Sequence, residues 1–107
     1  MTVTTTYTVS ELSANITYAH NPIVRGNYQT ITVAAYDSDG PKQGESIAIH
    51  ILYASGSTTH DLSCTTGTDG SCSGTWLIGG NSNPGTFQVT VTIQGVQFGS
   101  SFEVTTA

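Results

Sequence analysis

Two cysteines, Cys64 and Cys72, carry the most specific chemistry in the sequence, and turn-forming residues fill the segment between them. Asp69 and Gly70 within this segment favour a tight reversal, because glycine adopts positive φ freely and aspartate tolerates it. A reversal there would place the cysteines on neighbouring strands, within reach of a disulfide. Two thiolates alone fall short of a four-ligand zinc site. We therefore expect a disulfide and an oxidising compartment, against the alternative of two free buried thiols.

Four acidic residues could converge on a cation. Asp37 and Asp39 share an Asp-x-Asp-Gly turn, Glu45 follows it, and Asp69 precedes a glycine in a second turn. Calcium accepts carboxylate oxygens in turns, but the rest of an EF-hand loop is missing. The alternative is turn capping, in which the carboxylate accepts hydrogen bonds from nearby backbone N–H groups. We expect no obligatory cofactor, and calcium at Asp37, Asp39 and Asp69 is the exception left open.

Catalytic chemistry finds little support in the sequence. Acid–base catalysis needs titratable groups gathered in a pocket with shifted pKa values. His20, His50 and His60 are well separated along the chain, and the carboxylates fall mostly in separate loops. A Ser-His-Asp triad would lack the Gly-x-Ser-x-Gly elbow. We expect no catalytic residues and no enzymatic activity.

Asparagine and tyrosine side chains offer two further surface functions. Asn15 begins an Asn-Ile-Thr sequon and is a candidate for N-glycosylation. The five tyrosines could form an aromatic platform for sugar rings or for a partner surface. Tyr18 and Tyr53, however, share the register of apolar stripes, which favours packing in the core with a solvated hydroxyl. The five are Tyr7, Tyr18, Tyr28, Tyr36 and Tyr53.

The elements that must position these residues are β-strands. Strand-favouring Thr, Val, Ile and Tyr are common, and apolar and polar residues alternate over 29–36, 45–53 and 86–94. Turn signals recur about every 8–12 residues, which is typical of a β-sandwich. We expect an all-β sandwich of about seven or eight mostly antiparallel strands. Its core should include Ile47, Ile49, Ile51, Trp76, Phe87, Val89 and Val91.

The length of the chain indicates how many domains it forms, and its charge limits the partners that it can bind. The 107 residues suit one domain, with residues 1–13 as an N-terminal strand or extension, and we interpret it as a module of a longer protein. The net charge is −5, and Lys42 and Arg25 are the only standing cations. Neutralising phosphates requires several cations, so we expect no nucleic-acid partner. No apolar run is long enough to span a bilayer, so we expect no membrane insertion.

Several turn-and-strand signatures resemble a prokaryotic immunoglobulin-like domain of bacterial and archaeal cell-surface proteins, similar to invasin- and intimin-type modules. Residues 36–40 run from a strand into an Asp-x-x-Gly turn, and residues 68–70 form a shortened Thr-Asp-x-Gly turn. Residues 84–87, Pro-Gly-Thr-Phe, open the penultimate strand. The resemblance covers roughly residues 14–105. The Cys64–Cys72 pair is not a general feature of that family.

The resemblance implies a non-catalytic, extracellular module that acts as a stalk, spacer or adhesion segment of a secreted or cell-surface protein. Its expected partners are other domains of the same protein and a surface protein or glycan. One alternative is a carbohydrate-binding accessory module of a secreted enzyme. The other is a filament subunit in which residues 1–10 add a strand to the sheet of a neighbouring copy.

Overall fold

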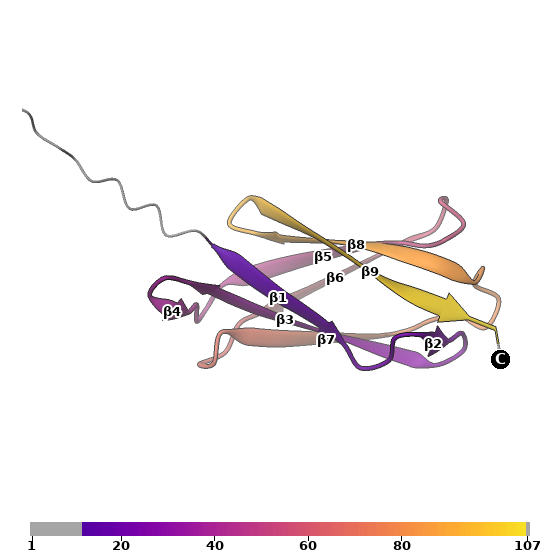
Figure 1. Cartoon of the computed structure of the whole chain (residues 1–107), viewed down its shortest axis with the longest axis horizontal. Coiled ribbons are helices and arrows are strands. Elements are labelled where there is room, and N and C mark those ends of the chain that lie inside the picture. Colours follow the sequence, from indigo (N-terminus) through magenta and orange to yellow (C-terminus); the bar gives the residue numbers. More distant parts are fainter. Residues whose placement is uncertain (1–11, 107) are drawn as a thin grey trace, which may run out of the picture.

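The computed structural model describes residues 12–106, which form two β-sheets packed face to face (Figure 1). The first sheet contains β1 (Ser13–Tyr18), β3 (Tyr28–Asp37), β4 (Gly40–Pro41) and β7 (Ser71–Leu77). The second contains β2 (Ile23–Val24), β5 (Ser46–Leu52), β6 (Thr59–Thr65), β8 (Gly85–Ile93) and β9 (Val96–Thr105). These residues include no helix that could cross a membrane. The all-β sandwich expected from the alternating pattern is confirmed.

Strand β3 is the centre of the first sheet. It pairs antiparallel with β1 along one side and with β7 and then β4 along the other. The second sheet has the order β2-β9-β8-β5-β6, in which β2 runs parallel to β9 and the other pairs are antiparallel. Seven strands are long, in agreement with the expected number. The sequence pattern did not indicate β2 and β4, because two residues are too few to show an alternation.

The core lies between the two sheets, on the inward face of each long strand. Ile49 and Ile51 of β5 are paired with Val91 and Val89 of β8, so four branched side chains form one buried layer. Every residue expected in the core is at most 4% exposed. Those seven residues are Ile47, Ile49, Ile51, Trp76, Phe87, Val89 and Val91.

The described chain starts at one end of the sandwich and finishes at the other. Ser13 pairs with Tyr36, close to β4, whereas Thr105 pairs with Val24 of β2. These two points lie near opposite ends of β3, as Figure 1 shows. The expected strand or extension at residues 1–13 lies outside the described residues, apart from Leu12 and Ser13. Strand exchange through residues 1–10 lies outside them as well.

The segment between the cysteines is an arch between the sheets. β6 pairs with β5 in the second sheet, and β7 pairs with β3 in the first. The expected tight turn is present, since the N–H of Gly70 donates to the carbonyl of Gly67. The strands that it joins do not pair as a hairpin, because the chain crosses from the edge strand of one sheet to the edge strand of the other. The seven residues between Cys64 and Cys72 are enough to span the spacing of about 10 Å between stacked sheets.

Candidate functional site

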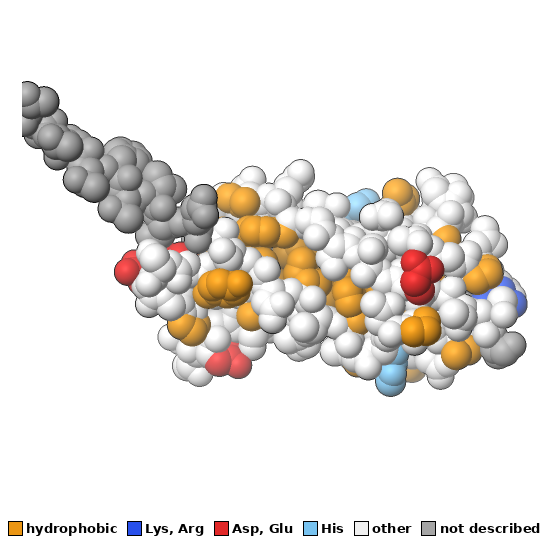
Figure 2. All heavy atoms as spheres, in the orientation of Figure 1, with side chains coloured by type: hydrophobic (Ala, Val, Ile, Leu, Met, Phe, Trp, Pro, Cys, Tyr) orange, Lys and Arg blue, Asp and Glu red, His pale blue; other side chains and the backbone are white. Residues whose placement is uncertain are grey.

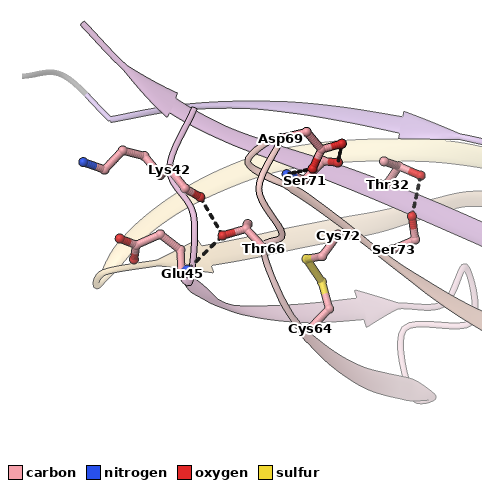
Figure 3. The surroundings of a disulfide bond; sticks show 9 residues. All are labelled: Thr32, Lys42, Glu45, Cys64, Thr66, Asp69, Ser71, Cys72 and Ser73. Carbon is pink, nitrogen blue, oxygen red and sulfur yellow. Dashed lines mark hydrogen bonds between the residues drawn. A yellow bond between two sulfur atoms is a disulfide. The ribbon is translucent and has the colours of Figure 1, made fainter. Parts of the chain in front are cut away.

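The arch is closed by a disulfide between Cys64 and Cys72 (Figure 3). Their Cα atoms are 5.9 Å apart, within the range that a disulfide spans. Both residues are half-buried and pack against the hydrophobic core. Because Cys64 lies on β6 and Cys72 on β7, the bond joins the two layers of the sandwich at their shared edge.

Thr66 fixes the arch against the connection that precedes β5. Its side chain is buried, and its hydroxyl donates to the carbonyl of Lys42 at 2.6 Å and accepts from the N–H of Glu45 at 2.8 Å. The backbone groups of Thr66 add bonds to Gly44 and Glu45. Sequence analysis did not single out this residue. Its only local signal is its place in a turn-rich segment, because its partners lie more than 20 positions away.

Two of the three candidate calcium ligands, Asp37 and Asp69, accept hydrogen bonds within turns. The carboxylate of Asp37 lies 3.0 Å from the ammonium of Lys42 and accepts from the N–H of Asp39 at 2.8 Å, and these bonds lower its pKa. Asp69 accepts from both the N–H and the hydroxyl of Ser71, which lowers its pKa as well. No three His, Cys, Asp or Glu side chains among residues 12–106 are arranged to hold a metal ion. Asp37 and Asp69 therefore act as turn caps, the alternative to calcium binding.

The histidines do not converge in the described fold. His50 lies on the outer face of β5, and its Nδ1 is 2.7 Å from a carboxylate oxygen of Asp61 on β6. Sequence analysis missed this pair, which follows from the register of the β5–β6 hairpin. Both side chains are at least half exposed, so the contact adds little stability. His60 stacks on Trp76 with 6.0 Å between ring centroids, and His20 is exposed.

The described tyrosines divide into packed and exposed groups. Tyr18 is half-buried, and its hydroxyl donates to Ser100; burial raises the pKa of this phenol. Tyr53 is also half-buried, whereas Tyr28 and Tyr36 are exposed. Tyr7 lies outside the described residues. Asn15 of the sequon is exposed on β1, so its side chain is accessible for modification.

A cleft of about 360 Å³ opens at the end of the sandwich that carries β2. The loop between β5 and β6 forms one wall with Tyr53, Ser55, Ser57 and Thr58. Residues 79–83, from the loop between β7 and β8, form the other wall. Every lining residue is uncharged. Sequence analysis did not find this cleft, because its two walls are more than 20 positions apart.

Both walls of the cleft are held by hydrogen bonds. In the first loop, the N–H of Tyr53 donates to the carbonyl of Thr58, and the N–H of Gly56 donates to the carbonyl of Tyr53. In the second loop, the N–H of Ser82 donates to the carbonyl of Gly79. The guanidinium of Arg25 donates to the carbonyl of Ser82 at 3.1 Å. The only arginine of the chain therefore supports a cleft wall.

A second hollow, of about 370 Å³, lies at the same end of the molecule. Its lining includes His20, Pro22, Asn27 and the exposed ring of Tyr28. Tyr28 pairs across the sheet with Leu77, which is also exposed. This arrangement is a small apolar patch with a polar border.

No family of known proteins and no curated protein matches the sequence. Solved structures with the same fold include part of the alkylpurine DNA glycosylase AlkC of Pseudomonas fluorescens, bound to DNA containing an abasic site analog. It is 16% identical, with a TM-score of 0.60 over 92% of this chain and 31% of that chain. The β-glucosidase EmGH1 of Erythrobacter marinus is 8% identical, with a TM-score of 0.53 over 90% of this chain and 16% of that chain. This chain therefore spans less than a third of either enzyme.

A third solved structure has the size of this chain. It is the CARDB domain of a Pyrococcus furiosus protein, in complex with di-metal ions, and it is 12% identical with a TM-score of 0.54. The match covers 94% of this chain and 91% of that domain. The immunoglobulin-like fold of this chain is thus shared with an independent domain of nearly equal extent. The finer resemblance to invasin and intimin modules has no match and stays a prediction.

Proposed function

We propose that residues 12–106 form a non-catalytic, immunoglobulin-like spacer module of a secreted or cell-surface protein. The observation that carries this proposal is the position of the two ends. Leu12 precedes β1 at the β4 end of the sandwich, and Thr106 follows β9 at the β2 end (Figure 1). A module that is entered at one end and left at the other adds its length to a linear array.

The terminal strands suit a module that carries tension. Pulling at Leu12 loads β1 along its own axis against β3, with which it forms six residue pairs. Pulling at Thr106 loads β9 in the same way against β8 and the parallel strand β2. Both loads act along the strands, so many ladder hydrogen bonds must fail together. The disulfide of the arch adds a covalent connection between the two sheets.

The surface and the disulfide support an extracellular setting. Disulfides persist in oxidising compartments and are rare in the cytosol. The visible face in Figure 2 carries few charged side chains among many uncharged ones, in agreement with a charged fraction of 8%. The two standing cations are already engaged, Arg25 with Ser82 and Lys42 with Asp37. A role on nucleic acid, as in the glycosylase complex, is therefore not part of the proposal.

The CARDB domain structure contains di-metal ions, but we do not propose metal binding for this chain. Asp37 and Asp69, two of the candidate calcium ligands, already accept hydrogen bonds from the N–H groups of Asp39 and Ser71. Asp37 is also neutralised by Lys42. A spacer role needs no bound metal, because the sheets are held by their core and by the disulfide.

A replacement experiment tests the spacer role. In the full-length protein, residues 12–106 would be exchanged for an unrelated β-sandwich whose ends also lie at opposite poles. An epitope on the side of the module farther from the cell should stay accessible to antibody on intact cells. Deletion of residues 12–106 should reduce that accessibility. If the exchange reduces it as much as the deletion does, the spacer proposal is wrong.

A further inference from the structure

We propose that the cleft between the loop of residues 53–58 and the segment of residues 79–83 binds a neutral carbohydrate chain. The inference adds a binding site to the spacer role and does not depend on it. It rests on three properties of the cleft: its uncharged lining, its hydrogen-bonding groups and the fixed aromatic ring in its wall.

The lining selects a ligand without charge. None of the residues that line the cleft is Asp, Glu, Lys, Arg or His, and the whole chain carries a net charge of −5. A phosphate, a carboxylate or an acidic polysaccharide would therefore find no cation in the lining, and the net negative charge of the chain disfavours its approach. The guanidinium of Arg25 lies outside the lining and donates a hydrogen bond to the carbonyl of Ser82 in the cleft wall. A cationic ligand would find no carboxylate in the lining.

The polar groups of the cleft match the hydroxyls of a sugar. Asn81 and Asn83 each carry an amide oxygen that accepts and an amide nitrogen that donates. Ser55, Ser57 and Thr58 on the opposite wall carry hydroxyls that do both. A sugar hydroxyl also donates and accepts, so it can form hydrogen bonds with both walls of the cleft. A volume of about 360 Å³ falls in the range of small-molecule sites, and the open mouth leaves room for a chain to continue.

Tyr53 adds an apolar surface for the C–H face of a sugar ring. Its ring packs on Phe87, with 4.4 Å between centroids, and its hydroxyl accepts a hydrogen bond from Trp76 at 3.2 Å. The ring is therefore already positioned, and binding would cost little conformational entropy. Glycoside hydrolysis needs a pair of carboxyl groups beside the scissile bond, and the lining holds none. The proposed role of the cleft is therefore to bind a sugar, not to cleave it.

The test is an NMR titration of the 107-residue chain with neutral hexasaccharides of glucose, mannose and xylose. We expect saturable shifts of the backbone amides in residues 53–58 and 79–83 with at least one of them. An anionic hexasaccharide of galacturonic acid should cause no such shifts. The double substitution Asn81→Ala and Asn83→Ala should weaken the binding at least tenfold. Both residues are exposed, so the fold should be retained.

Gln97→Ala provides the matched control. This exposed amide lies on β9 beside the β8–β9 turn, at the opposite end of the sandwich, and its removal should leave the affinity unchanged. Absence of saturable binding with all three neutral sugars would overturn the proposal. So would binding that maps to the Tyr28 hollow or that survives the double substitution. None of these results would bear on the spacer role, which the replacement experiment tests separately.

Discussion

The hydroxyl oxygen of Tyr53 accepts a hydrogen bond of 3.2 Å from the indole nitrogen of Trp76. Trp76 is a core residue of β7 in one sheet, and Tyr53 directly follows β5 in the other. The bond satisfies an indole N–H that is removed from water, and it also fixes an aromatic ring in the wall of the cleft. The packing of the core and the shape of the cleft are therefore coupled through this pair.

Removal of the indole should destabilise the domain strongly. Trp76→Ala leaves a cavity between the sheets and should lower the free energy of unfolding by about 3–5 kcal/mol. Trp76→Phe keeps most of the apolar contact with Phe102 and should cost less. Urea denaturation followed by circular dichroism measures both changes. The fluorescence of the unmodified protein should have the short-wavelength maximum of a buried indole, and an emission typical of solvent exposure would contradict the assignment.

Reduction of the disulfide should weaken the domain without changing its fold. The intact mass should be about two hydrogens below that of the reduced protein, since each sulfur loses one hydrogen on oxidation. A closed loop with a sequence separation of 8 contributes roughly 2–3 kcal/mol in the chain-entropy estimate. The double substitution of Cys64 and Cys72 by serine should lower the urea midpoint accordingly. Detection of free thiols in the native protein would show that the bond is not formed.

Thr66→Val should be costly although the two side chains have nearly the same shape. The substitution leaves the carbonyl of Lys42 and the N–H of Glu45 without their partner. An unsatisfied buried polar group costs about 1–3 kcal/mol. Thr65→Val is the matched control, because Thr65 is the exposed neighbour and its substitution should change stability little. Equal urea midpoints for the two variants would mean that Thr66 does not hold the arch.

Stability should fall in acid through Asp37 and Asp69. Hydrogen bonds lower the pKa of both carboxyls in the folded protein below the ordinary value of about 3.9. Each group therefore contributes stability above that value, and the contribution is lost as the pH falls through the lowered folded pKa. Urea midpoints measured from about pH 6 to pH 2 should decrease below about pH 4. The decrease should be smaller in the double variant Asp37→Asn and Asp69→Asn, and an unchanged slope would argue against this origin.

Calcium should not stabilise the domain. A ligand that binds only the folded state raises the melting temperature according to its concentration relative to Kd. Asp37 is paired with Lys42, and Asp69 is bonded to Ser71, so a cation would have to displace both arrangements. Thermal melts in millimolar calcium and in chelator should therefore coincide. A shift of many degrees that disappears in Asp69→Asn would identify the two turns as a metal site.

The sequence by itself determined the long strands with a regular apolar pattern and the core residues that they carry. In β5 and β8, large apolar residues at every second position are the buried ones, so the inward face follows from the two-residue period of a strand. Gly70 has a φ of +79°, a left-handed backbone conformation that glycine adopts freely. Its place after Asp69 already indicated a turn. These properties depend on neighbours along the chain, which a single sequence displays.

Only the tertiary structure decided how the strands are divided between the sheets and what their loops build. The same turn residues between Cys64 and Cys72 are compatible with a hairpin and with an arch, and the pairing of β6 with β5 selects the arch. The bonds of Thr66 to Lys42 and Glu45 and the cleft beside Tyr53 join segments that are distant in sequence. Their geometry depends on the packing of two sheets about 10 Å apart, which no local pattern of residues encodes.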